Sequence, residues 1–188
     1  MNLTERLPKA VMVDGVRYPI RTGFRSWVRF DTILTESDLP YHERLALALS
    51  AVLREKTLPD NLGGLLSALF DFYACGAQKS GKQAKGGGRV LSFTQDAPLI
   101  YAAVLSQYGV DLTQKNPHWH AFCAMICGLD ADCTLSKIMG YRSVNLSDIT
   151  DKTQRSFLKK MKARYKLQDK RTQTEIERDT ADALSRLM

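Results

Sequence analysis

The sequence lacks the features that mark membrane proteins and disulfide-stabilised secreted proteins. No stretch approaches the roughly 18 uninterrupted apolar residues that a membrane-spanning helix needs, and residues 1–6 lack the apolar core of a signal peptide. Only four of the 188 residues are cysteine, which is far below the density of a disulfide scaffold, so we expect reduced thiols. These absences predict a cytoplasmic protein that does not enter a membrane.

Histidine is scarcer still, at three residues, and no pattern supplies a nucleophile, a base and an orienting group together. Structural zinc needs four nitrogen or sulfur ligands, usually from short turns or two elements, and the chain has no Cys-x-x-Cys pair. Free cysteine commonly packs as a small hydrophobic residue. We therefore expect a non-enzymatic protein without cofactor or metal, and interpret as core residues the best metal candidates, which are His118, His120, Cys123, Cys127 and Cys133.

The first predicted element is a β-hairpin. The dipeptide Asp14-Gly15 favours positive φ at both central positions of a type I′ turn, and it separates the apolar-rich runs 11–13 and 16–18. Pro19 ends the second strand or restricts it to a sheet edge. The run 90–93 is a weaker strand prediction.

From residue 22 onward the apolar residues recur with the period of an α-helix. Helices are predicted over residues 23–35, 39–54 and 61–74, and we expect the three to form one packed layer. Two sets of side chains are expected to be buried: in the second helix Leu45, Leu49, Val52 and Leu53, and in the third Leu62, Leu65, Leu66, Leu69, Phe70 and Tyr73.

Further helices are predicted in the second half. One begins at Asp96 and Pro98 and stops at Gly109. Asn116 and the proline after it are typical of a helix start, and they predict a helix over residues 117–128. This helix is the expected centre of the core, with Trp119, Phe122 and Ile126 on one stripe. A short helix over 135–139 is predicted to end at Gly140.

These elements predict a mainly α fold, a bundle of about six to eight helices with a short N-terminal β-hairpin. We expect residues 8–150 to form a helical domain, interrupted by a mobile glycine-rich basic loop over 76–89. Residues 151–188 are expected to form a basic, mixed-charge helical extension, because its apolar stripe is thin.

The formal charge of +7 is concentrated in two places. The loop over 76–89 holds four basic residues, and residues 152–171 hold nine with a single aspartate. The basic residues spread around much of the predicted helix, which favours a solvated face or contact with an acidic protein over tracking of one phosphate backbone. Nucleic-acid binding stays open as an alternative. The candidate partner-binding residues are Arg155, Lys159, Lys160, Lys162, Arg164, Lys82 and Lys85.

The order of these motifs resembles the bacteriophage Gp15 family over roughly residues 8–168. The resemblance rests on the run 13–27 and on later segments that include Gln107-Tyr108-Gly109, His118-Trp119 and Tyr141-Arg142. It implies a protein of the phage or prophage tail module, encoded near the tape-measure gene. The implied role is a tail assembly chaperone that binds the tape-measure protein, or other tail proteins, in the host cytoplasm. Self-association of the chain is a further expectation of this interpretation, and a structural tail component is an alternative.

Overall fold

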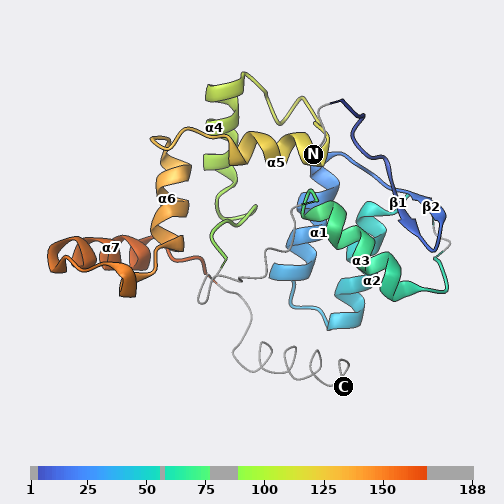
Figure 1. The fold of residues 1–188 in the computed structure, drawn as a ribbon, viewed down its shortest axis with the longest axis horizontal. Helices are drawn as coiled ribbons and strands as arrows, with labels where there is room; N and C mark the ends of the chain where they lie inside the picture. The colour runs from blue at the N-terminus through green and yellow to red at the C-terminus, as the bar shows by residue number, and fades with distance from the viewer. Residues whose placement is uncertain (1–3, 56–57, 77–88, 169–188) are drawn as a thin grey trace. The chain divides into compact units, whose positions relative to one another are not determined.

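The computed structural model describes residues 4–55, 58–76 and 89–168, and it confirms a mainly helical protein with an N-terminal β-hairpin (Figure 1). Seven α-helices and one short 3-10 helix lie in these described residues. The contacts between residues divide the chain into two compact units, an N-terminal unit of residues 8–69 and a C-terminal unit that contains residues 70–167. The separation of a basic extension from residue 151 onward stays a prediction.

The hairpin has the predicted geometry. Strand β1 (Ala10–Val13) pairs antiparallel with strand β2 (Val16–Pro19). Between them Asp14 and Gly15 have φ angles of 50° and 78°, which are the left-handed angles of a type I′ turn. The Asn61 side chain donates a hydrogen bond of 2.9 Å to the Asp14 carboxylate. This bond attaches the turn to the rest of the N-terminal unit.

Two helices lie side by side after the hairpin, α1 (Phe24–Glu36) and α2 (Tyr41–Val52), close to the predicted ranges (Figure 1). Trp27 and Phe30 of α1 are buried, with their ring centroids 5.2 Å apart. The indole N–H of Trp27 donates a hydrogen bond of 2.8 Å to the carbonyl of Arg21. Two of the three aromatic residues of α1 thus lie in the core of the N-terminal unit.

The buried face of α2 differs from the prediction in one turn. Arg44 and Ala48 are buried, whereas Leu45 is only half-buried. The Arg44 guanidinium donates to the carbonyl of Leu34 on α1, so α1 covers the stripe that contains Arg44. Leu45 lies about 100° further around the helix. The predicted burial is therefore wrong for Leu45 and right for Leu49, Val52 and Leu53.

Helix α3 (Leu62–Tyr73) contributes to both units. Leu65 and Leu69 are fully buried as predicted. Leu62 and Phe70, which were predicted to lie on the same buried face, are exposed at 47% and 45%. The apolar residues of α3 surround more of its circumference than its neighbours cover, so sequence periodicity overestimated the buried stripe.

The C-terminal unit contains helices α4 (Ala97–Tyr108) and α5 (Trp119–Cys127). Helix α4 ends at Gly109, as predicted, with a left-handed φ of 63°. The expected cap at Asn116 is wrong, because the side chain of His118 accepts the hydrogen bond from the backbone N–H of His120. Helix α5 therefore begins two residues later than predicted.

The core of this unit gathers around the first half of α5. Trp119 and Phe122 are almost fully buried, and Trp119 stacks on Tyr73 with ring centroids 5.2 Å apart. The indole N–H of Trp119 also donates a 2.8 Å hydrogen bond to the Tyr73 carbonyl. In the second half, Ile126 is half-buried and Cys127 is exposed. The prediction of a central helix thus applies to the first half of α5 alone.

Residues 90–93 form no strand, which corrects the weaker strand prediction. The backbone N–H of Ser92 donates to the Asp96 carboxylate at 2.9 Å, and the N–H of Gln95 donates to the Ser92 hydroxyl at 3.1 Å. Side chains thereby satisfy the backbone locally, in competition with a ladder of strands. Asp96 is the N-cap residue of α4, as its predicted start requires, but its carboxylate makes no capping hydrogen bond, because it accepts this bond and pairs with Arg142.

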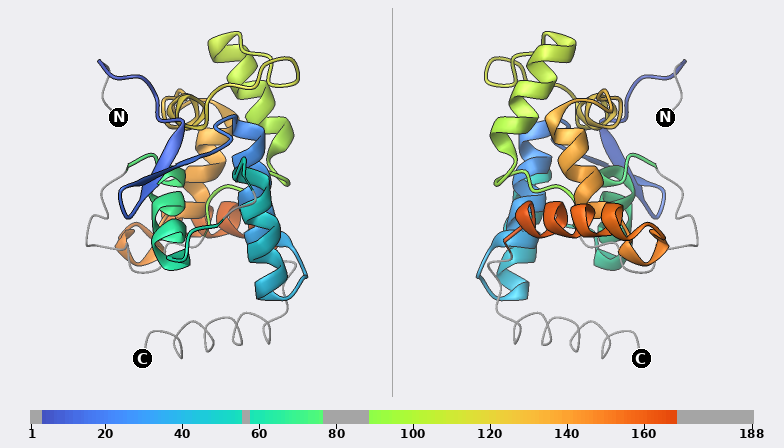
Figure 2. Two further views of the ribbon diagram at one scale, coloured as in Figure 1. Left: turned by 90° about the vertical axis from the view of Figure 1, so that its right-hand side faces the viewer. Right: turned by 90° about the vertical axis from the view of Figure 1, so that its left-hand side faces the viewer.

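Helices α6 (Thr134–Ser143) and α7 (Lys152–Arg164) complete the described chain, with a short 3-10 helix η1 (Leu146–Asp148) between them. Helix α6 continues through Gly140, so the predicted range 135–139 was too short. The two helices cross at a steep angle (Figures 1 and 2). The Tyr141 ring of α6 stacks on the Tyr165 ring that follows α7, at 6.0 Å between centroids.

Candidate functional site

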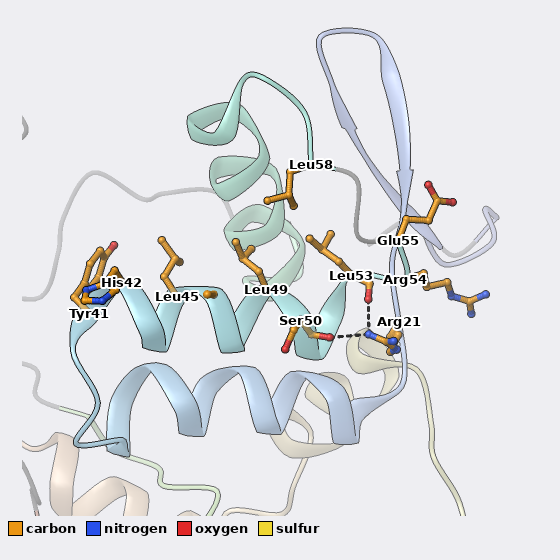
Figure 3. A pocket seen from close by; sticks show the side chains of 11 residues that line it. Arg21, Tyr41, His42, Leu45, Leu49, Ser50, Leu53, Arg54, Glu55 and Leu58 are labelled. Atoms are coloured by element: carbon orange, nitrogen blue, oxygen red, sulfur yellow. Dashed lines mark hydrogen bonds between the residues drawn. The ribbon is translucent and has the colours of Figure 1, made fainter.

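The N-terminal unit carries an apolar groove along α2, with a volume of about 510 Å³ (Figure 3). Its apolar lining consists of Tyr41, Leu45, Ala46, Leu49, Leu53 and Leu58. Its polar lining consists of Arg21, His42, Ser50, Arg54 and Glu55. The apolar side chains run along α2, and the two arginines gather at one end.

The period of α2 creates the floor of the groove. Tyr41, Leu45, Leu49 and Leu53 follow one another at steps of four residues, which places them in a row along one side of the helix. Leu58, from the segment between α2 and α3, lies across from this row (Figure 3). Leu49 and Leu53 are buried at the bottom of the groove, and Leu45 is half-buried.

The open rim of the groove is also apolar. Tyr41 and Leu58 are exposed at 44% and 45%. Large apolar side chains that stay open to water, here at one end of the row and across from it, are typical of protein interaction sites. A helix with an apolar stripe could place that stripe on this floor.

The polar end of the groove is built by side chains that satisfy carbonyl groups. One guanidinium nitrogen of Arg21 donates to the carbonyl of Ser50 at 2.8 Å, and also to the carbonyl of Leu53. These carbonyls belong to the last turn of α2 and the residue after it, where an α-helix leaves acceptors unsatisfied. Arg54 donates through Nε to the carbonyl of Ile20 at 3.2 Å. Both arginines thereby hold a positive charge beside the last leucine of the row.

Sequence reasoning did not identify this groove. The available signal was an excess of leucine on α2, where Leu45, Leu47, Leu49 and Leu53 occupy more of the circumference than a single buried stripe requires. The sequence could not say which of these leucines another element would cover.

The second candidate surface is α7, which carries five of the predicted partner-binding residues. Lys159 and Lys160 are exposed, and neither forms an ion pair with an acidic side chain of the described chain. Arg164 is exposed and lies over the Tyr165 ring, 5.6 Å from its centroid. Lys82 and Lys85 lie outside the described residues. Lys159, Lys160 and Arg164 thus face solvent on this helix, and Arg155 is exposed as well.

The two remaining basic residues of the set stabilise the local fold. Arg155 donates through Nε to the carbonyl of Ile149 at 2.9 Å. Lys162 is half-buried and donates to the carbonyl of Val144 at 2.6 Å. Both bonds attach α7 to the segment that leads into it. Whether these residues also contact a partner stays a prediction.

The apolar side of α7 is incompletely covered. No residue of this helix is fully buried, and Phe157 is 50% exposed, although its ring lies 6.2 Å from that of Tyr141. Leu158 and Met161 are half-buried. Helix α7 therefore presents exposed lysines and an open apolar stripe on one element.

The histidines and cysteines expected in the core are buried to different degrees: His120 is buried, His118, Cys123 and Cys133 are half-buried, and Cys127 is exposed, so the core interpretation is wrong for Cys127. His120 is buried, and its Nε2 lies 2.9 Å from the carbonyl of Phe72. Burial lowers the pKa of His120, and this carbonyl opposes the shift. A hydrogen bond between the thiols of Cys75 and Cys123 lowers the pKa of Cys75, and the same bond together with burial raises the pKa of Cys123.

In the described residues, no group of three or more His, Cys, Asp or Glu side chains could hold a metal ion. Within the same residues, no helix has the length and apolar character needed to cross a membrane.

Comparison with known protein families finds a match to the family described as "Bacteriophage Gp15 protein" over residues 3–167. The match covers most of the chain and includes both candidate surfaces. Comparison with curated proteins finds no match, and comparison with solved structures finds none either.

Proposed function

Because the chain belongs to the bacteriophage Gp15 protein family, we propose that it is a non-enzymatic tail assembly protein of a phage or prophage. Its proposed role is that of a chaperone, which binds the tape-measure protein in the host cytoplasm before the tail tube forms around it.

The observation that carries this proposal is the amount of apolar surface left open on helices. Tyr41 and Leu58 of the groove are 44% and 45% exposed, and Phe157 of the apolar stripe on α7 is 50% exposed. Contiguous exposed apolar surface marks sites where other proteins bind. A tape-measure protein is long and helical, so its own apolar stripes need cover until the tube surrounds them.

The exposed cations of α7 extend the proposed contact. Lys159 and Lys160 would meet acidic side chains of the tape-measure helix, while the apolar stripe of α7 covers its apolar residues. Electrostatic contacts at the rim of an interface mainly raise the association rate. We therefore assign α7 to capture of the partner and the groove to its retention.

The same arrangement favours a protein partner over nucleic acid. Arg155 and Lys162 already donate to backbone carbonyls, which reduces the number of cations on α7 that could reach phosphates. Single-strand binding also stacks successive bases on exposed aromatic rings, whereas on the described part of this segment Phe157 is exposed and Tyr165 is half-buried against Tyr141.

The test is co-expression of the full chain with the tape-measure protein encoded in the same phage genome, followed by affinity capture of the chain. The two proteins are expected to elute together, and the tape-measure protein is expected to stay in solution where it aggregates alone. Lys159→Glu with Lys160→Glu should slow association several-fold without changing the free energy of unfolding. A tape-measure protein that neither elutes with the chain nor gains solubility from it contradicts the proposal.

A further inference from the structure

The groove on α2 has a shape and a charge distribution that define the helix it would accept. Its row of apolar side chains from Tyr41 to Leu53 covers twelve helical steps, which is a length of about 18 Å, or about three turns. A partner helix of this length offers apolar residues at intervals of three or four positions. Extended peptides bind through an exposed sheet edge, and no strand lines this groove.

The end of the groove beside Leu53 adds a requirement for negative charge. Arg21 and Arg54 lie there, and within the described residues neither forms an ion pair with Glu55. The terminal nitrogens of Arg54 make no hydrogen bond to any described residue, since its one bond uses Nε. In Figure 3 the side chains of Glu55 and Arg54 point in different directions. A carboxylate of the partner would find bidentate donors at this position.

From these two features we infer that the α2 groove binds a three-turn amphipathic helix that carries a carboxylate at one end of its apolar stripe. The inference rests on the proposed function and names the segment class of the tape-measure protein that the groove retains. The carboxylate sets the direction of the bound helix, because the opposite end of the groove presents Tyr41 and His42.

The same charge distribution argues against a second copy of the chain in the groove. A second copy that offered this face would bring two more arginines and one glutamate. Its cations would then lie against an apolar row without a matching set of carboxylates. The groove therefore fits a partner with the opposite charge at one end better than it fits itself.

Two leucines of matched exposure provide the test. Leu58 lines the groove and is 45% exposed, whereas Leu47 of α2 lies outside the groove lining and is 42% exposed. Leu58→Glu should weaken binding of the full chain to the tape-measure protein by about tenfold or more. Leu47→Glu should change it less than about twofold, and both variants should keep the wild-type circular dichroism and melting temperature.

The charge requirement has its own test with a synthetic probe. The probe is an amphipathic helical peptide with an apolar stripe of about 12 residues, or about three turns, that carries leucines every three or four positions and one glutamate at the end of the stripe. Arg54→Gln should weaken binding of this peptide to the full chain several-fold. With a peptide in which glutamine replaces the glutamate, wild type and Arg54→Gln should bind with nearly the same affinity. An equal effect of Arg54→Gln on both peptides would overturn the assignment of the carboxylate.

The remaining outcomes separate this inference from the proposed function. If the wild-type chain does not retain the tape-measure protein, the proposed function fails. If it does, but Leu58→Glu behaves like Leu47→Glu, the groove assignment fails and the proposed function stands. A wild-type dimer that Leu58→Glu converts to a monomer would assign the groove to a second copy and overturn the inference. If the full chain with Ile176→Glu and Leu184→Glu binds the peptide more tightly than the wild type, the C-terminal segment of the chain occupies the groove. That result would also overturn the inference.

Discussion

A single guanidinium, that of Arg142, joins three segments of the C-terminal unit. It pairs with Asp96 through two bonds of 2.6 and 2.9 Å, and both side chains are nearly buried, with 9% and 4% of their surface exposed. The same group donates to the carbonyl of Val90 at 3.0 Å and to that of Tyr165 at 2.6 Å. It thus connects the start of α4, the segment before it and the end of α7.

Loss of one partner from this ion pair should be strongly destabilising. Asp96→Asn leaves the buried guanidinium without its countercharge, so we expect the free energy of unfolding to fall by about 3 kcal/mol or more. The control is Asp132→Asn, which removes the exposed Lys137–Asp132 pair of 3.2 Å and should cost less than about 1 kcal/mol. Urea denaturation of both variants measures the difference. Equal losses would show that the buried pair is not a major source of stability.

His120 makes the stability of the same unit sensitive to acid. Burial lowers its pKa below the ordinary value of 6.5, so the folded state binds fewer protons than the unfolded state. Its contribution to stability is therefore complete above about pH 6.5 and decreases as the pH falls toward the lowered pKa. We expect the wild type to lose more stability between about pH 7.5 and about pH 5 than His120→Gln.

Glutamine suits this comparison because its amide can still donate to the carbonyl of Phe72, yet it does not titrate. His42 and His118 remain in both proteins, so their contributions cancel. Urea denaturation at the two pH values measures the loss in each. Equal losses in the two proteins would show that another group causes the acid sensitivity.

At the scale of the element, α5 and α7 differ in how much of their apolar surface the chain itself covers. Phe122 of α5 is 1% exposed and lies in a cluster of rings with Trp119 and Phe93. Phe157 of α7 is 50% exposed. Helix α5 is thus covered by its own unit, whereas α7 keeps an apolar stripe exposed for contact with a partner.

This contrast predicts different costs for the same substitution. Phe122→Ala creates a cavity in the core and should lower the free energy of unfolding by about 3–5 kcal/mol. Phe157→Ala removes a half-exposed ring and should cost about 1 kcal/mol or less. Thermal or urea denaturation provides both values. A loss below about 1 kcal/mol for Phe122→Ala would mean that α5 is not central to its unit.

Most elements could be predicted from the sequence because their determinants are local. The Asp14-Gly15 turn, the apolar period of α1 and the stop of α4 at Gly109 each depend on a few neighbouring residues. The run 90–93 was wrongly predicted because the side chain of Asp96 competes for its backbone. The presence of a basic helix at α7 was predicted correctly, but the carbonyl contacts of Arg155 and Lys162 depend on how the preceding segment folds.

At the scale of the whole molecule, the net charge of +7 raises the question of whether ionic or apolar contacts supply most of the free energy of binding to the partner. Contacts with nucleic acid weaken steeply as salt releases counterions, by about 10³-fold or more between about 50 and 200 mM for a protein with many phosphate contacts. Apolar contacts in a groove weaken little over the same range.

We therefore expect the dissociation constant for the tape-measure protein to rise less than about tenfold over this range of salt. Any affinity for duplex DNA should fall far more steeply. Fluorescence anisotropy at two salt concentrations measures both. A thousandfold loss for the tape-measure protein would indicate that the basic residues, and not the apolar groove, supply the binding energy.

The amino-acid sequence by itself determined the class of fold, the hairpin and the approximate position of each described helix, because turn conformation and apolar period act over a few residues. Only the tertiary structure decided which apolar side chains stay open and which charges are buried. Leu45 lines a groove because α1 covers a different stripe of α2, and Leu58 lies across from it in the segment that follows α2. Asp96 and Arg142, 46 residues apart, pair because the fold brings distant segments together, and no local pattern encodes such a contact.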